Sequence, residues 1–212
     1  MIWLEVLVEG ASDEPAVREV LIRKFNLSEG EHFRIHPHRG KGRLPQNPLS
    51  LPNIKHQGLL DQLPAKLRGF GRSLPDHAVV LVVVDVDDTS CRDLLKELNS
   101  MLDALPNKPK VLFRLAIEET ESWFLADIEA LQKAYPTQLK RPILKGISPD
   151  AVVGAWETLA RALGLEPKSV GPGVKTDWAK KISPHLNLDT PRSPSFKKLI
   201  DGIDKLVQEG RT

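Results

Sequence analysis

The segment AVVLVVVDVDD, residues 78–88, determines the fold class that we predict for this chain. Its first seven residues are apolar and mostly β-branched, and three aspartates, Asp85, Asp87 and Asp88, follow within four positions. The apolar run is too short to cross a membrane and too rich in β-branched residues for a helix, so we expect a strand that is covered on both faces. Ligands of open α/β sheets bind at the carboxyl ends of such strands.

Two other apolar segments end in acidic residues in the same way. Residues 2–8 lead into Glu9, and residues 110–117 lead into the acidic cluster 118–121. These strands alternate with segments of helical spacing, and this alternation predicts an α/β, Rossmann-like fold with a mostly parallel central sheet flanked by helices. The helices expected in this part of the chain cover residues 13–25, 55–70, 90–104 and 121–135, and a further short strand is expected at residues 32–36.

The end of the chain has a different character. Residues 136–212 alternate amphipathic stretches with connections rich in Lys, Pro and Gly. We expect this part to form a helical C-terminal extension that packs on an α/β domain of residues 1–135, rather than an independent domain. The expected helices of the extension cover residues 150–163, with Val153 on the apolar face, 175–186 and 195–207.

A basic loop interrupts the α/β domain. Residues 36–56 are rich in Pro and Gly, and between residues 35 and 75 seven Lys or Arg stand against one acid. A loop of this length inside a compact domain is usually functional or disordered, and its charge favours contact with an anion. We therefore expect Arg39 and Lys41, together with Lys175 of the extension, to contact phosphate oxygens.

Composition excludes several classes of protein. The chain has 212 residues, a net charge of +2 and a single cysteine, Cys91. One cysteine forms neither an intrachain disulfide nor a zinc cage, and we expect the HxH pair His36 and His38 to be solvated or to touch a phosphate rather than to bind zinc. No apolar run approaches the roughly 20 residues of a membrane helix, so we expect a cytoplasmic protein that does not bind a membrane.

The acidic strand ends should meet, because the carboxyl ends of parallel strands lie at one edge of a sheet. Glu9 and Asp13 should be neighbours there, together with Asp85, Asp87 and the acidic cluster 118–121. Two ionised carboxylates about 4 Å apart repel by roughly 4 kcal/mol at an effective dielectric constant of 20. The site therefore needs a cation, and Mg²⁺ or Mn²⁺ with oxygen ligands suits such a set of carboxylates. Within the cluster we expect Glu118 and Glu119 to be solvated.

The motifs at two of these strand ends resemble the signatures of the Toprim domain. LVEGASDE, residues 7–14, supplies a glutamate at the end of the first strand, and VVDVD, residues 83–87, supplies a DxD after a later one. The second acid four residues after the glutamate, Asp13, makes the chain similar to the overcoming-lysogenization-defect (OLD) nucleases. A narrower likeness, to a stand-alone Toprim-like family, covers most of the chain: VEGASDE, RGKGRL, VVDVDD, EETESWFLAD and SPSFKKLIDGI.

The resemblance implies a metal-dependent nucleic-acid phosphodiesterase, with DNA as the expected substrate. It implies that Glu9, Asp85 and Asp87 bind the metal, that Asp13 supports the same or a second ion, and that Glu121 belongs to the same set. Lys41 matches the lysine of that family's Gly-Lys element. Members of the narrower family are often encoded beside an ABC-type or AAA-type ATPase, in loci suspected of phage defence. The chain has no GxxxxGK[ST] motif, so any ATP dependence would come from such a separate ATPase.

Two other classes of protein also fit the sequence. Residues 85–89, DVDDT, satisfy the DxDxT pattern of haloacid-dehalogenase-like phosphatases, in which the first aspartate is a nucleophile and the second a general acid. That pattern normally begins near the start of a chain, whereas here it follows 84 residues. The other class is a non-catalytic Toprim-like protein that binds nucleic acid or an ATPase through the basic loop and the helical extension. On either Toprim reading, Asp88 is a charge at the start of a helix rather than a ligand.

Overall fold

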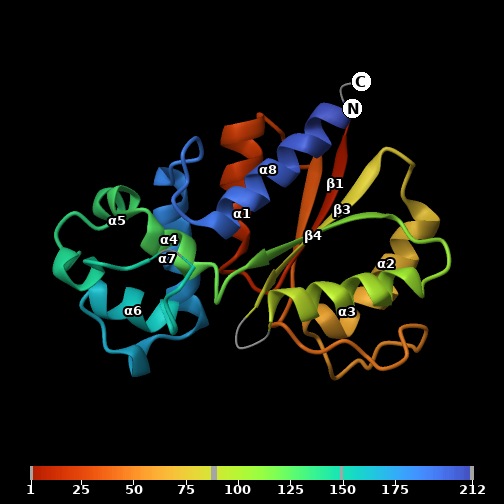
Figure 1. Ribbon diagram of the computed structural model, residues 1–212, viewed down its shortest axis with the longest axis horizontal. Coiled ribbons are helices and arrows are strands. Elements are labelled where there is room, and N and C mark those ends of the chain that lie inside the picture. Colours follow the sequence, from red (N-terminus) through yellow and green to blue (C-terminus); the bar gives the residue numbers. More distant parts are fainter. Residues whose placement is uncertain (1, 87–89, 149, 211–212) are drawn as a thin grey trace.

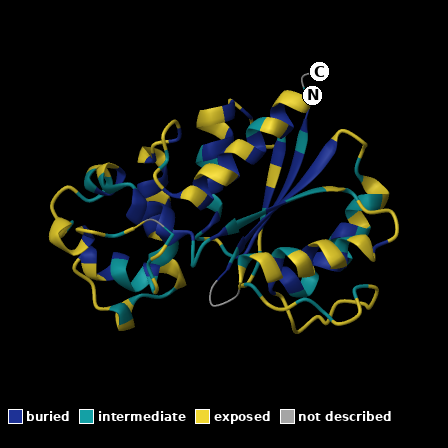
Figure 2. Cartoon of the chain, viewed as in Figure 1, coloured by how far each residue is buried: buried dark blue, intermediate teal, exposed yellow. Residues whose placement is uncertain are grey.

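The computed structural model describes residues 2–86, 90–148 and 150–210. Its centre is a sheet of four parallel strands: β1 (Trp3–Val8), β2 (Phe33–Pro37), β3 (Ala78–Asp85) and β4 (Lys110–Ala116). The strands lie in the order β2-β1-β3-β4, and the two central strands are buried almost throughout (Figure 2). The α/β fold predicted from residues 78–88 is confirmed, with that segment supplying a central strand.

Helices cover both faces of the sheet (Figure 1). One face carries α1 (Glu14–Glu19), which continues as a π-helical turn (Val20–Lys24), and the C-terminal helix α8 (Pro194–Glu209). The other face carries α2 (Leu59–Ser73) and α3 (Cys91–Asp103). Alternate residues of β3 enter the two resulting cores: Leu81 packs in the first, and Val82 in the second.

A lobe of short helices stands beside the carboxyl ends of the strands (Figure 1). It contains α4 (Glu121–Ala126), α5 (Ile128–Ala134), α6 (Ala155–Ala162), α7 (Pro172–Ile182) and short 3₁₀ turns at Arg141–Leu144, Pro167–Ser169 and Ser183–His185. The lobe shares the first core: the Trp123 ring stacks on Phe196 of α8 at 4.8 Å, and its Nε1 donates to Ser195 Oγ at 2.9 Å. None of the helices in the described ranges is both long and apolar enough to cross a bilayer.

The helices predicted over residues 55–70 and 175–186 are shifted by three or four residues, to Leu59–Ser73 and Pro172–Ile182, and two others differ more. The helix expected over residues 121–135 breaks at Asp127, whose carboxylate accepts the Ala130 N–H and so caps a second helix, α5. The helix expected over residues 150–163 begins only at Ala155, because Gly154 has a φ of +69° and turns the chain. Val153, predicted to lie on the apolar face, is therefore 83 % exposed.

Candidate functional site

Glu9 lies at the tip of β3, although it follows β1 in the sequence. Its carboxylate oxygen Oε1 accepts the backbone N–H of Asp85 at 2.8 Å, and its backbone carbonyl accepts the Gly40 N–H at 2.9 Å. The side chain of Glu9 is almost fully buried. The first two predicted acids, Glu9 and Asp85, are thus in contact at the carboxyl edge of the two central strands.

Asp13 joins the end of β1 to the segment that follows β4. Its Oδ2 accepts the Gly10 N–H, and its Oδ1 accepts the hydroxyl of Thr120, each at 2.8 Å. Both Asp13 and Thr120 are buried. Asp13 is also the residue that precedes α1, where a negative charge interacts favourably with the helix dipole. Sequence reasoning did not identify Thr120, because a lone threonine carries no signal until the fold places it beside a carboxylate.

Glu121 begins α4 and is 3 % exposed. The ammonium group of Lys175, from α7, lies 3.5 Å from Glu121 Oε1 and 3.2 Å from Glu119 Oε1. The same nitrogen lies 4.9 Å from the centre of the Trp156 ring, whose backbone N–H donates to Glu119 Oε2 at 3.3 Å. The expectation that Glu119 is solvated is therefore wrong: it is half-buried and ties the lobe to the acidic edge.

The acids influence one another electrostatically. Burial raises the pKa of Asp85 well above its ordinary value, and the charges of Asp13, Glu9 and Glu121 raise it further. Burial raises the pKa of Glu121 to about 7, although the charge of Lys175 acts in the opposite direction. The pKa of Asp13 is also raised by burial, against the hydrogen bonds from Thr120 and Gly10. Burial is the largest cause of all three shifts, and repulsion between the carboxylates adds to those of Asp85 and Glu121.

The predicted phosphate-contacting residues lie in different surroundings. Lys41 is at the edge, where its Nζ donates to the Val86 carbonyl at 3.0 Å. Arg39, nearby in the basic loop, is exposed. The charges of Glu121 and Glu119 raise the pKa of Lys175, although burial alone would lower it. Lys175 therefore stays charged, and any contact with phosphate would compete with its two carboxylate partners.

The HxH histidines are not free surface groups. His36 Nε2 lies 2.5 Å from Glu5 Oε2, inside a polar cluster that includes the indole N–H of Trp3. His38 Nδ1 lies 2.8 Å from the Val8 carbonyl, and burial lowers the pKa of this histidine. The expectation that both are solvated or touch phosphate is thus wrong for His36, which pairs with a buried glutamate.

Asp87, the fifth predicted ligand, and Asp88 lie outside the described residues. Within the ranges that the structure describes, no group of three His, Cys, Asp or Glu side chains is arranged to coordinate a metal ion. Carboxylates without a cation repel one another and take other partners, as Glu121 does with Lys175 and Asp13 with Thr120. The donor chemistry, several buried carboxylates with raised pKa values, fits Mg²⁺ or Mn²⁺, and binding requires these side chains to reorient.

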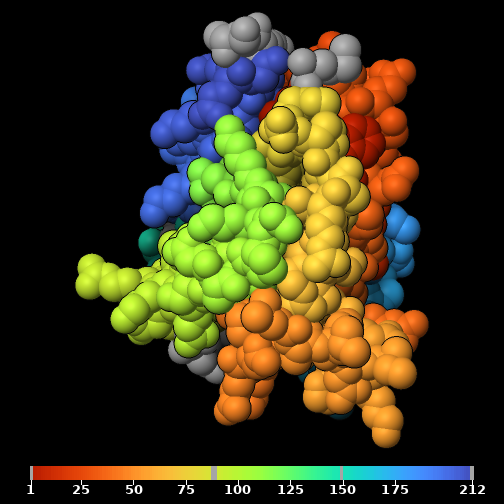
Figure 3. All heavy atoms as spheres, turned by 90° about the vertical axis from the view of Figure 1, so that its right-hand side faces the viewer, coloured from red at the N-terminus to blue at the C-terminus, as the bar shows by residue number. Residues whose placement is uncertain are grey.

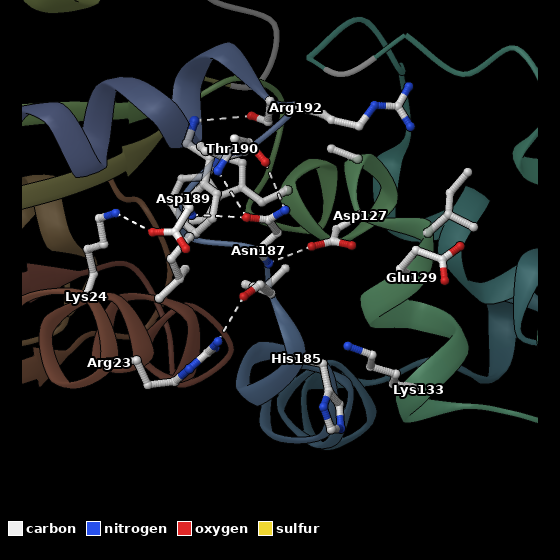
Figure 4. A pocket seen from close by; sticks show the side chains of 18 of the residues that line it. Arg23, Lys24, Asp127, Glu129, Lys133, His185, Asn187, Asp189, Thr190 and Arg192 are labelled. Carbon is white, nitrogen blue, oxygen red and sulfur yellow. Dashed lines mark hydrogen bonds and ion pairs between the residues drawn. The ribbon is translucent and has the colours of Figure 1, made fainter.

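A cavity of about 770 Å³ lies away from this edge, between α4, α5 and residues 185–193 (Figure 4). None of the predicted site residues lines it. Several of its charged groups already bind one another or the backbone: Lys24 pairs with Asp189 at 2.5 Å, and Asp127 accepts the Asn187 N–H at 2.7 Å. We therefore place the candidate site at the acidic edge rather than in this cavity.

The chain matches one family model, described as "Domain of unknown function (DUF4276)", over residues 8–204. The match includes Glu9, Asp85, Glu121 and Lys175, and it extends from the first strand to the last helix. No curated protein and no solved structure matches the chain.

Proposed function

We propose that this chain, which belongs to the DUF4276 family, is a metal-dependent nucleic-acid phosphodiesterase of the Toprim/OLD-nuclease kind. One observation carries the proposal: carboxylates that follow three different strands gather at one edge of the sheet. Glu9 contacts the backbone of Asp85, Asp13 bonds the loop after β4, and the charge of Glu121 raises the pKa of Asp85.

The charge balance favours a bound divalent cation over a purely structural role. Each acid could stand alone at a strand end or helix start, but burying several of them together costs free energy unless positive charge compensates. Lys175 is shared between Glu119 and Glu121, and the pKa of Glu121 is nonetheless raised. A Mg²⁺ or Mn²⁺ ion would supply the missing positive charge.

The residues have distinct roles in this proposal. Glu9, Asp85, Asp13 and Glu121, with Asp87, would hold one or two ions. When bound, such ions activate a water molecule and stabilise charge on a phosphodiester and its leaving oxygen. Lys41 and Arg39 would orient the phosphate from the adjacent loop, a role that positions a nucleic acid without reading its sequence.

A separate ABC-type or AAA-type ATPase is the proposed protein partner. The resemblance to OLD nucleases supports this partner, because those proteins carry an ATPase fused to their Toprim domain. DNA is the proposed substrate, and the resemblance to the narrower stand-alone Toprim-like family supports a role in phage defence. No membrane is involved in this proposal.

Cleavage of DNA tests the proposed activity. Asp85→Asn keeps the shape of the side chain and removes its charge, so Mn²⁺-dependent cleavage should disappear while the fold stays intact. Asp76→Asn is the matched control, since Asp76 is an exposed aspartate in the turn that precedes the same strand. Cleavage by the Asp85→Asn protein in a clean preparation would contradict the proposal.

Two results would instead favour the other classes of protein. Stable association with an ATPase, without calorimetric binding of Mg²⁺ or Mn²⁺, would identify a non-catalytic partner. Trapping of beryllofluoride at Asp85 as an aspartyl-phosphate analogue would identify a haloacid-dehalogenase-like phosphatase.

A further inference from the structure

The loop that joins β2 to α2, residues 38–57, exposes three large aliphatic side chains. Leu49 is 54 %, Leu51 89 % and Ile54 87 % exposed. Figure 3 shows this orange segment projecting from the lower end of the molecule, beyond α2 and α3. Burying a leucine or isoleucine side chain contributes roughly 1.5–3 kcal/mol. Three such side chains exposed within six residues therefore indicate a surface that binds another molecule.

The two ends of this loop are fastened together. The Arg39 N–H donates to the Gln57 carbonyl at 3.2 Å, and the Arg43 N–H donates to Asp61 Oδ1 at 3.2 Å. Gly42, at a φ of +67°, packs so closely on Gly58 that a Cβ added to Gly58 would lie 2.5 Å from the Gly42 nitrogen. Gly42 and Gly58 therefore hold the two ends of the loop close together, and we call this contact the neck of the loop.

The tip of the loop is held in a defined shape. Arg68 of α2 donates to the carbonyls of Pro48 and Ser50, the latter at 2.9 Å. The side chains of Asn47 and Asn53 each accept the backbone N–H two residues ahead, which is an Asx turn. The aliphatic side chains are thus presented on a frame of hydrogen bonds rather than on a slack segment.

The neck stands at the candidate metal site. Gly40 donates its N–H to the carbonyl of Glu9, and Lys41 donates to the carbonyl of Val86. The segment 38–57 contains four Lys or Arg residues and no acid. A ligand of this basic loop is therefore expected to be a polyanion, and a metal ion bound at the acidic edge would allow the same ligand to contact that edge.

We propose that Leu51 and Ile54 insert between base pairs of double-stranded DNA while Arg39, Arg43 and Lys55 contact its phosphates. Proteins that kink a duplex use Leu, Ile and Pro as wedges between base steps, flanked by basic residues. This inference rests on the proposed function and deepens it, because it names the duplex as the substrate form. The kink would present a phosphodiester to the carboxylates at the neck.

The composition of the loop argues for a duplex over single strands. Proteins that bind single-stranded DNA or RNA stack the bases on aromatic side chains. Residues 38–57 contain no Phe, Tyr or Trp, and their two histidines already have partners, His38 in the Val8 carbonyl and His56 in Asp61. The segment contains three exposed aliphatic residues and three prolines instead. Aliphatic side chains of this kind insert between stacked base pairs, and stacked base pairs are present in a duplex.

The test measures base unstacking without cleavage. Duplexes that carry 2-aminopurine at successive positions are titrated with protein in EDTA, where no metal supports catalysis. The variant is Leu51→Ser/Ile54→Ser, and the matched control is Val153→Ser, a substitution of an aliphatic residue that is 83 % exposed on the helical lobe. Both change exposed side chains, so both proteins should fold.

Wild-type and Val153→Ser proteins should raise the 2-aminopurine fluorescence. The double variant should lose this rise and bind the duplex about tenfold more weakly, because the gain from burying the two side chains is largely offset by the few kcal/mol that unstacking a base step costs. Equal fluorescence and affinity for the double variant would overturn the inference, and so would a wild-type protein that binds no duplex. Loss of ATPase association by the double variant, with DNA binding unchanged, would identify a protein-docking loop instead.

The fluorescence experiment tests insertion of the loop separately from the proposed nuclease activity. Asp85→Asn protein should unstack the duplex as wild type does, since the wedge needs no metal. If wild-type protein cleaves DNA without unstacking its bases, the insertion of Leu51 and Ile54 is contradicted and the proposed nuclease activity is not. If the protein unstacks the duplex but cleaves DNA under no condition, the nuclease activity is contradicted and the insertion of Leu51 and Ile54 is not.

Discussion

The backbone N–H of Asp85 donates to Oε1 of Glu9 at 2.8 Å, across 76 positions of sequence. This bond joins the tips of the two central strands and turns the Glu9 carboxylate toward the end of β3. Asp85 donates through its backbone, so this bond does not involve the Asp85 carboxylate, which lies near those of Asp13, Glu9 and Glu121. The same edge receives Asp13 and Glu121 from other segments, and the free energy of this arrangement depends on pH and on cations.

The metal-free protein should lose stability as the pH rises from 5 to 7.5. Glu121 has a pKa of about 7 in the folded chain against an ordinary 4.5, so the folded state binds more protons in this range. The free energy of unfolding then falls with rising pH, by an amount of the order of 3 kcal/mol for this group. Urea denaturation at several pH values in EDTA measures the loss, and Mn²⁺ at pH 7.5 should reverse it.

Glu121→Gln isolates the contribution of this residue. The variant should show a flatter dependence of stability on pH than wild type. The lowered pKa of His38 acts in the opposite sense and is present in both proteins, so it cancels in the comparison. Identical pH profiles for the two proteins would contradict the burial of Glu121 among the other carboxylates of the site.

Lys175→Met should destabilise the protein and raise the pKa of Glu121 above about 7. The substitution removes the cation that lies 3.2 and 3.5 Å from Glu119 and Glu121, leaving both carboxylates without that partner. Removing one member of a buried ion pair costs about 3–5 kcal/mol, and the partial exposure of Lys175 places the expected loss at the lower end. Lys180→Met, an exposed lysine of the same helix, should change the unfolding free energy by less than about 0.5 kcal/mol.

Gly58→Ala should destabilise the protein by about 1–3 kcal/mol, the usual cost of overpacking. The new Cβ would lie 2.5 Å from the backbone of Gly42, so the neck of the loop must open. Gly69→Ala, inside the following helix with no atom within 4 Å of its added Cβ, should instead stabilise by about 0.5–1 kcal/mol. Urea denaturation distinguishes the two, and equal effects would show that the neck is not tightly packed.

The main features of the sheet could be predicted because they depend on local patterns. The apolar run before Asp85 identifies a buried strand, and parallel topology then brings the strand ends to one edge whatever the loop lengths. The contact of Glu9 with the tip of β3 follows from the same reasoning.

Other features depend on packing between segments that are distant in sequence. The pairing of Glu119 with Lys175 arises because α7 of the lobe packs near the start of α4, and no spacing rule links them. The break at Asp127 depends on its carboxylate capping a new helix turn, which competes with continuation of the helix. His36 resembles a surface residue of a basic loop in sequence, but strand pairing places it beside Glu5.

A crystal structure of the protein grown with Mn²⁺, with the ion located by its anomalous scattering, tests the central claim most directly. We expect a peak at the carboxyl edge of the sheet, about 2.0–2.4 Å from carboxylate oxygens of Glu9 and Asp85, with Glu121 turned away from Lys175 toward the ion. Mn²⁺ bound elsewhere, or an acidic edge without a peak in crystals that contain saturating Mn²⁺, would contradict the assignment of these carboxylates as a metal site.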